Sequence, residues 1–147
     1  MITVRIATQR DRGTVRRIEC ACFGYERFLF GLWPRTGRAD STTWIAESDG
    51  MPTGYVIAYD RHLNGMPIMY VGGVGVLPKN RKQGVASQLM KAVLAQHPRL
   101  WLHVRASNIA ATALYLKLGM RIGQRIQQFY SNGDTALVMQ SATITEE

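Results

Sequence analysis

The chain has 147 residues, of which 46% are hydrophobic, and its 18 Lys and Arg against 10 Asp and Glu give a net charge of +8. This length and composition predict a single soluble globular domain over residues 1–147 and exclude disorder as the main state. No apolar run approaches the ~20 residues of a membrane-spanning helix, and the N-terminus lacks the apolar region of a signal peptide. Two cysteines, Cys20 and Cys22, are too few for a disulfide framework, which favours a cytoplasmic protein.

The positive charge favours an anionic partner without naming one. Four of the arginines crowd one short segment, at positions Arg10, Arg12, Arg16 and Arg17. A solvated helix face is the ordinary explanation for such a cluster. A phosphate-rich ligand, a ribonucleoprotein and an acidic peptide are the alternatives that the charge leaves open.

The chain begins with a predicted strand and a predicted helix. Residues 2–7 alternate between apolar and polar side chains, which predicts a strand. Thr8 and Asp11 have the spacing of a capping box, which predicts a helix over 9–23. Cys22 falls on the apolar face of that helix, so we expect it to be a core residue and not a nucleophile.

A second apolar, aromatic segment spans 25–33 and precedes a block of strands. We expect these strands at 43–47, 54–60 and 68–76. The Asp49-Gly50 and Asn64-Gly65 pairs between them are typical of tight hairpin turns, so we expect the strands to form an antiparallel meander.

The second half of the chain returns to helices. We expect a helix over 84–96, a strand over 100–104, a helix over 109–118 capped by Asn108 and ended by Gly119, and strands over 120–130 and 135–140 joined by a turn at Asn132-Gly133. The tail after Ser141 is expected to fray. The strand–helix–strand order over 68–104 predicts a parallel pair with a right-handed crossover, so the fold class is α+β, a mixed sheet with helices on its faces.

The most informative segment is 74–87, where a strand leads through a short basic turn into the start of a helix. The unpaired N–H groups of a first helical turn and the helix dipole together favour an anion at that point. Gly84 allows the backbone to approach a phosphate closely, and Ala86 keeps the first turn uncrowded. Three cations add charge to the turn: Lys79, Arg81 and Lys82. The spacing fits neither the P-loop nor the dinucleotide fingerprint.

Two blocks of the sequence resemble a known family. Arg81-x-x-Gly84-x-Ala86, after a strand that ends in Val-x-Leu-Pro, resembles the acyl-CoA pyrophosphate loop of the GNAT N-acetyltransferases. The strand from Leu100 to Asn108, followed by Tyr115 and Gly119, resembles the bacterial ribosomal-protein alanine N-acetyltransferases (RimI type). The resemblance implies the GNAT fold, in which the two central strands, here 68–76 and 100–104, splay apart within a mixed and mostly antiparallel sheet. It also implies acetyl-CoA as the cosubstrate.

The resemblance assigns the acetyl-CoA contacts to three segments. The backbone of Val74, Gly75 and Val76 would pair with the pantetheine arm and polarise the thioester carbonyl. The phosphates would lie against the basic turn and the first turn of the helix, at Arg81, Lys82, Gln83, Gly84, Val85, Ala86 and Ser87. Asn108 would contact CoA in addition to capping its helix. Glycines at 72, 73 and 75 favour close approach of a ligand to the strand, with a bulge or tight packing as the alternative.

Two residues are candidates for the proton transfers. By resemblance Tyr115 protonates the departing CoA thiolate, with ordinary packing at a helix–sheet boundary as the alternative. His103 stands where the bacterial relatives carry a glutamate that acts as the general base. A neutral imidazole with an ordinary pKa of about 6.5 can also accept a proton, so we hypothesise that His103 replaces the carboxylate. The alternative is a polar side chain on a strand face with no catalytic role.

These observations predict an N-acetyltransferase that moves acetyl from acetyl-CoA directly to a primary amine, with the α-amine of a protein or peptide N-terminus as the expected acceptor. A small-molecule amine is the alternative acceptor, and a non-catalytic module that binds RNA or the ribosome is the alternative class. Tyr25 and Tyr130 are candidates for the acceptor entrance or for core packing. Nucleic acid is not the favoured partner, and a monomer and a homodimer both stay open. No set of His, Cys and Asp has metal-ligand spacing, so we expect no metal.

Overall fold

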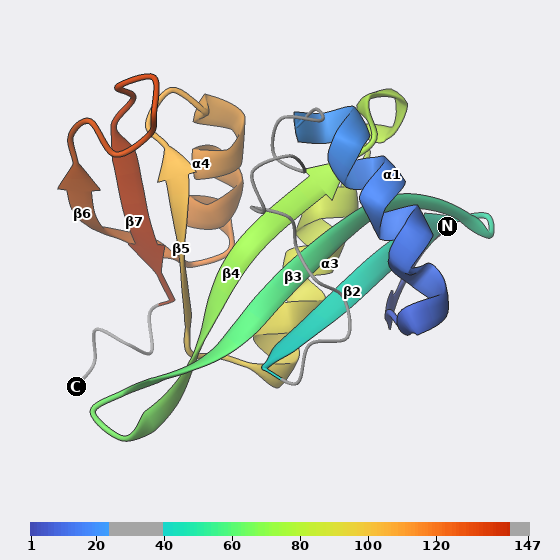
Figure 1. The fold of residues 1–147 in the computed structure, drawn as a ribbon, viewed down its shortest axis with the longest axis horizontal. Helices are drawn as coiled ribbons and strands as arrows, with labels where there is room; N and C mark the ends of the chain where they lie inside the picture. The colour runs from blue at the N-terminus through green and yellow to red at the C-terminus, as the bar shows by residue number, and fades with distance from the viewer. Residues whose placement is uncertain (24–39, 142–147) are drawn as a thin grey trace.

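The computed structural model of the chain describes residues 1–23 and 40–141 (Figure 1). Its strands are β1 (Ile2–Ile6), β2 (Ser41–Ser48), β3 (Met51–Leu63), β4 (Met66–Val76), β5 (Leu100–Arg105), β6 (Arg121–Ile126) and β7 (Ala136–Gln140). Its helices are α1 (Arg12–Phe23), α3 (Val85–Gln96) and α4 (Ile109–Lys117), with short 3-10 turns at Gln9–Asp11 and Pro78–Asn80. The aromatic segment at 25–33, with Tyr25, and the tail after Ser141 lie outside the described residues.

The strands form one seven-stranded sheet in the order β1-β2-β3-β4-β5-β7-β6. Every neighbouring pair is antiparallel except β4 and β5, which are parallel. Helix α1 lies on one face of the sheet and α3 on the other, as Figure 1 shows. The α+β prediction and the parallel crossover over 68–104 are confirmed. In the described part of the chain, no helix is long and apolar enough to cross a membrane.

The meander of β2, β3 and β4 is built on the two predicted turns. Asp49 and Gly50 both have positive φ, as do Asn64 and Gly65, and two consecutive positive φ angles define the hairpin turn whose twist matches that of the strands. Because pairing continues to the end of the second hairpin, at Leu63 with Met66, β3 and β4 run longer than the sequence predicts.

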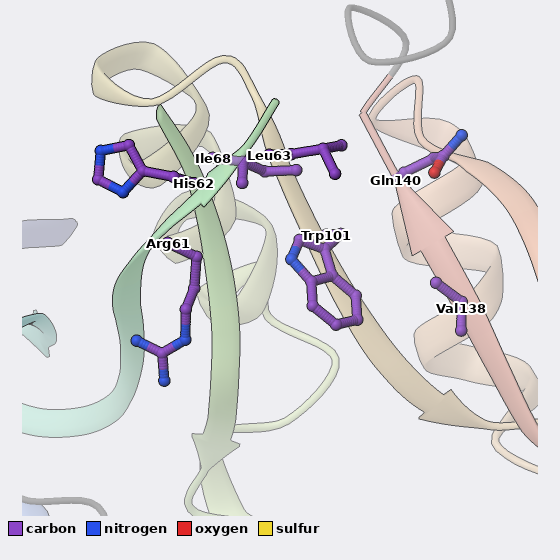
Figure 2. Close-up of a pocket in the computed structure, with 7 residues that line it drawn as sticks. All are labelled: Arg61, His62, Leu63, Ile68, Trp101, Val138 and Gln140. Carbon is purple, nitrogen blue, oxygen red and sulfur yellow. The ribbon is translucent and has the colours of Figure 1, made fainter. Parts of the chain in front are cut away.

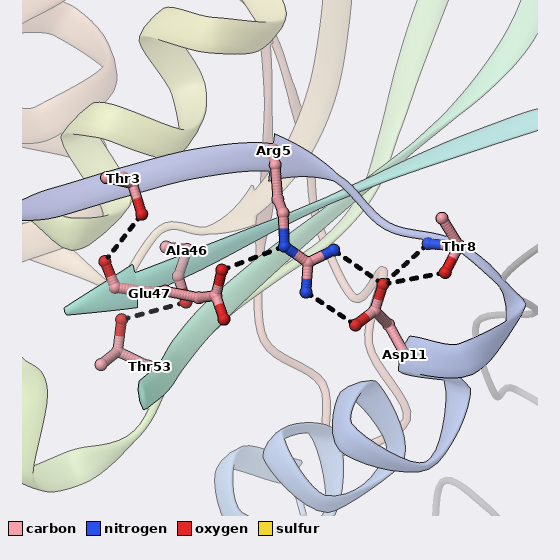
Figure 3. Close-up of polar contacts among 7 residues, drawn as sticks. All are labelled: Thr3, Arg5, Thr8, Asp11, Ala46, Glu47 and Thr53. Carbon is pink, nitrogen blue, oxygen red and sulfur yellow. Dashed lines mark hydrogen bonds and ion pairs between the residues drawn. The ribbon is translucent and has the colours of Figure 1, made fainter. Parts of the chain in front are cut away.

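The first helix begins as a 3-10 turn at Gln9–Asp11 and continues as α1. The Asp11 carboxylate accepts the Thr8 N–H at 2.8 Å, which is the carboxylate half of the predicted capping box (Figure 3). Val15 and Ile18 are buried against β3, and the four arginines of the segment are exposed. Cys22 is partly buried, its thiol donates to the Val76 carbonyl at 3.3 Å, and burial raises its pKa. A packing role for this cysteine is confirmed.

The prediction of a strand over 120–130 is wrong in its second half. Strand β6 ends at Ile126, and residues 127–135, which we call the β6–β7 turn, leave the sheet. Gln128 takes a positive φ of 54°, which a strand cannot accommodate. The backbone N–H groups of Phe129 and Tyr130 then both donate to the Asp134 carbonyl and close the turn.

Alternation along β5 divides its side chains between the two faces of the sheet. Leu100, Leu102 and Val104 are buried in the core beneath α3 and α4. Trp101, His103 and Arg105, which are only half-buried, point to the opposite face. This opposite face, on which α1 also packs, carries His103.

Candidate active site

Strands β4 and β5 separate soon after they meet. They pair over only three positions, from Met69 with Leu100 to Val71 with Leu102. Beyond this point β5 pairs with β7, whereas β4 continues to Val76 paired with β3. From Gly73 to Val76, β4 therefore has no paired strand on its β5 side among the described residues, and Figure 1 shows the two strands diverging. This is the predicted splay.

The glycines of β4 make room for tyrosines from the neighbouring strand. A Cβ at Gly72 would lie 2.5 Å from the Tyr59 ring, and one at Gly75 would lie 2.7 Å from the Tyr55 ring. The β3–β4 register also shifts opposite Gly72, which marks a bulge. The bulge and the tight packing account for these glycines without a ligand, so the glycine content by itself gives no evidence for one, and the ligand contact stays a prediction. The edge of β4 that β5 leaves remains the feature that suits an extended ligand.

The basic turn after β4 has the geometry of an anion site. Gly84 caps α3 with a φ of +86°, a value that favours glycine, and Lys82 also has positive φ. The first helical hydrogen bond runs from Gln88 N to Gly84 O at 3.0 Å, so the N–H groups of the three residues before Gln88 lie outside the ladder. No acidic residue occurs in the first turn. The first turn of α3 therefore supplies no carboxylate of its own to compete with an anion at its N–H groups.

Side chains of the same turn hold its shape. Arg81 donates through Nε to the Val76 carbonyl at 3.0 Å, and Gln83 donates to the Lys79 carbonyl at 3.3 Å. Lys79 and Lys82 are exposed. Arg81 thus joins the end of β4 to the turn. Its side chain is exposed, so the Nη groups of the guanidinium are accessible to an anion.

Asn108 and Tyr115 occupy different environments on α4. Asn108 is exposed, and its Oδ1 accepts the Ala111 N–H at 3.1 Å, which confirms the predicted cap and leaves its Nδ2 for another partner. Tyr115 is 7% exposed and lies in the core on the α3 face. Burial raises the pKa of Tyr115 to about 12, so its phenol stays protonated at neutral pH.

His103 forms a close pair with Tyr70 on the other face. The Tyr70 hydroxyl oxygen lies 2.8 Å from His103 Nδ1. Desolvation by burial lowers the pKa of His103, so the imidazole is neutral at pH 7. In the tautomer in which Nδ1–H donates to Tyr70, the Nε2 lone pair is free to accept a proton.

Aromatic rings continue from this pair in both directions. We call these five residues the aromatic row: Tyr70, Trp101, His103, Phe129 and Tyr130. Trp101 lies 4.5 Å from Tyr70 between ring centroids, and the Phe129 ring stacks on the His103 ring at 4.5 Å with an interplanar angle of 15°. The row forms one wall on the face of the sheet that carries His103.

A cavity of about 280 Å³ adjoins the row at Trp101 (Figure 2). It lies between the β3–β4 hairpin and strands β5 and β7, and it is lined by Arg61, His62, Leu63, Ile68, Trp101, Val138 and Gln140. Trp101 also lies 5.3 Å from His103 between ring centroids. The cavity and the imidazole therefore share one neighbour.

The chain is similar in sequence to known acetyltransferases. A family model described as the acetyltransferase (GNAT) family matches residues 13–120. The chain belongs to the GNAT acetyltransferase family. It is 32% identical to an N-terminal acetyltransferase complex ARD1 subunit homolog of Dictyostelium discoideum, over 95% of this chain and 72% of that protein.

Solved structures share the GNAT fold of this chain. Arabidopsis thaliana NAA60 in complex with acetyl-CoA superposes with a TM-score of 0.79 at 22% identity, covering 95% of this chain and 97% of that one. The ribosomal-protein-S18-alanine N-acetyltransferase of Escherichia coli superposes with a TM-score of 0.76 at 21% identity, covering 96% and 93%. At these identities the likeness establishes the fold.

Within this GNAT domain the predicted site residues fall into two groups on either side of the splay. The basic turn, Asn108 and Tyr115 belong to α3 and α4, whereas His103 lies on the face of α1. Three members of the row had no role predicted from the sequence: Tyr70, Trp101 and Phe129. The signal for Tyr70 was its place on a strand that pairs in parallel with the strand of His103, but the register needed to use that signal comes only from the fold.

Proposed function

We propose that the protein transfers the acetyl group of acetyl-CoA directly to a primary amine, and that the acceptor is the α-amine of a protein N-terminus. The observation that carries this proposal is the splay, which has a proton acceptor, His103, on one face and a protonated phenol, Tyr115, on the other. Family membership supports acetyl transfer, and relatives described as N-terminal acetyltransferases support the acceptor.

Acetyl-CoA fits the α3 side of the splay. Its pyrophosphate would accept from the N–H groups of Val85, Ala86 and Ser87, with Arg81 and Lys82 as counter-charges. The pantetheine amides would pair with the edge of β4 that β5 leaves, at Val74, Gly75 and Val76, as an added strand does. The Val76 carbonyl already accepts from Cys22 and Arg81, so Val76 would offer its N–H. The Nδ2 group of Asn108, which the helix cap does not use, would donate to the same ligand.

The amine would approach from the face that carries the aromatic row. His103 Nε2 takes the proton of the ammonium group, in the tautomer in which Nδ1–H donates to the Tyr70 hydroxyl oxygen. The free amine nitrogen attacks the thioester carbon, the C–S bond breaks, and the thiolate takes the proton of Tyr115. The new amide nitrogen then gives up its extra proton, which returns the Tyr115 phenolate to the phenol, and His103 releases its proton to solvent. Holding both reactants across one opening supplies much of the acceleration.

The test uses three acceptors with acetyl-CoA: a peptide with a free N-terminus, the same peptide with a blocked N-terminus and an internal lysine, and a small alkylamine. Free CoA thiol is measured, and the acetylated position is mapped by mass spectrometry. We expect acetylation of the free α-amine and none of the blocked peptide. Turnover of the alkylamine alone would reassign the acceptor to small molecules.

Acetyl-CoA alone provides the second measurement. A ligand at a hundred times its Kd raises the free energy of unfolding by about 2.7 kcal/mol, which shifts the thermal midpoint upward. Absence of both the shift and the thiol product, with tight and salt-dependent RNA binding instead, would support the non-catalytic module and contradict the proposal.

A further inference from the structure

Arg105 gathers the β6–β7 turn onto the end of β5. Its Nη1 donates to Asn132 Oδ1 at 3.0 Å and to Asp134 Oδ2 at 2.9 Å. The guanidinium carbon lies 3.9 Å from the centroid of the Tyr130 ring. One side chain therefore contacts three residues of a turn that has left the sheet.

Asp134 transmits this contact through the turn. Its backbone carbonyl accepts the N–H groups of Phe129 at 3.1 Å and of Tyr130 at 3.2 Å. Its carboxylate also accepts from Asn132 Nδ2 at 3.2 Å, and the Asp134 N–H returns a bond to Asn132 Oδ1 at 3.1 Å. The position of Phe129 is therefore tied to the residue that Arg105 holds.

Phe129 is the point at which the turn meets the imidazole. Its ring stacks on His103 although Phe129 itself is 44% exposed. The Phe129 ring also contacts the Tyr130 ring, at 5.0 Å between centroids, and Tyr130 belongs to the same turn. The place of Phe129 over His103 therefore depends on the turn.

We propose that Arg105 is a positioning residue that clamps the β6–β7 turn so that Phe129 covers His103 and the turn forms the acceptor-side wall of the site. The role in catalysis rests on the proposed function, whereas the effect on the imidazole does not. Tyr70 contacts His103 directly, and Arg105, Asp134 and Tyr130 are the charged and titratable groups of the clamp itself.

The first experiment measures the imidazole pKa of His103 directly, by NMR titration of ring-labelled protein with the resonance assigned through His103→Gln. Phe129→Ala removes the ring that shields His103 from water, so the pKa of His103 should rise toward the ordinary value of about 6.5. The size of this rise is the reference for the other variants. Arg105→Lys keeps the charge but loses the planar fork, so we expect the pKa to rise toward that of Phe129→Ala.

Asp134→Ala separates the clamp from simple electrostatics and serves if Arg105→Lys does not fold. Loss of a nearby negative charge by itself lowers a histidine pKa, whereas loss of the Phe129 cover raises it. The clamp predicts a rise. Arg125→Lys is the matched control, because Arg125 is exposed on β6 and its side chain makes no hydrogen bond or ion pair with the described residues. The His103 pKa of this variant should equal that of wild type.

The second experiment measures acetyl transfer in the same variants. We expect Arg105→Lys to raise the KM for the peptide about tenfold while leaving the KM for acetyl-CoA unchanged, because a misplaced wall affects one reactant only. A wild-type His103 pKa and peptide KM in both Arg105→Lys and Asp134→Ala would overturn the clamp. A pKa rise in these variants of a protein that transfers no acetyl group would keep the clamp and reject the proposed function.

Discussion

Arg5 and Arg105 make similar contacts in two parts of the sheet but hold different things in place. Arg5 donates to both oxygens of Asp11 at 2.8 Å and to Glu47 at 3.0 Å, and so joins β1, β2 and the start of the first helix (Figure 3). Arg105 also binds an aspartate and a second side chain, but its partners belong to a turn that covers His103.

A charged cluster therefore does not by itself locate a functional site. The Asp11 carboxylate caps the first helix by accepting from Thr8 and also accepts from Arg5, so both of its oxygens serve structural contacts. The Arg105 cluster leads through Phe129 to an imidazole with a lowered pKa at the splay. Variants near Arg5 should therefore change stability alone, and variants near Arg105 should change the reaction.

The largest effect is expected at His103. His103→Gln removes the proton acceptor while keeping a polar side chain beside Tyr70, so we expect kcat to fall by about 10²–10³-fold with little change in stability. His97→Gln is the matched control, because His97 lies at the end of α3 beside Trp44 and does not line the cavity. Equal kcat values in the two variants would leave His103 without a catalytic role.

Tyr115 should give the next largest effect. Tyr115→Phe removes only the hydroxyl from a buried ring, so we expect kcat to fall by about 10–100-fold while the free energy of unfolding stays the same. Tyr55→Phe makes the same change in a buried tyrosine whose hydroxyl has no hydrogen-bond partner among the described residues. A loss of stability without a loss of rate in Tyr115→Phe would favour plain packing.

Gly84 should affect both stability and acetyl-CoA. Gly84→Ala forces a side chain into positive φ, which costs about 1–2 kcal/mol of the free energy of unfolding, and it distorts the N–H groups proposed to hold the phosphates. Gly65→Ala carries the same strain in the β3–β4 hairpin, where no Cβ contact occurs either. We expect the KM for acetyl-CoA to rise in Gly84→Ala only, as measured by steady-state kinetics.

The smallest effect is expected at Arg5 and concerns stability alone. Arg5→Met should lower the free energy of unfolding by about 1 kcal/mol in denaturant titrations and leave kcat unchanged. The Arg5 guanidinium holds the pKa of Asp11 below its ordinary value, so this stabilisation is present above the unfolded pKa of about 3.9. It is lost as the pH falls through the lower folded value. A change in kcat would break the separation between the two arginines.

Local sequence signals predicted most of the elements. The hairpin turns at Asp49-Gly50 and Asn64-Gly65, the cap at Asn108 and the basic turn before α3 each depend on neighbouring residues, and the structure confirms each of them. These features depend only on backbone sterics and on hydrogen bonds at helix ends, and both are determined by residues close together in the sequence.

Features that depend on register were not predictable in this way. Tyr70 meets His103 because Tyr70 pairs with Trp101 in the parallel strand, and nothing within either segment sets that alignment. Positions 72 and 75 of β4 require glycine because the rings of Tyr59 and Tyr55, from β3, occupy the space that a Cβ would take. The end of β6 depends on Gln128, a residue type that gives no signal for positive φ.

The most direct test of the account is the pH dependence of acetyl transfer to a peptide α-amine, measured in wild type and in His103→Gln. The amine titrates near 7.7–8.0 in both proteins, so only the difference between the two profiles reports on His103. The base must be neutral to accept a proton, so the wild-type rate should fall as the pH drops through a pKa below about 6.5. That acidic limb should be missing in His103→Gln, and profiles of identical shape would contradict the account.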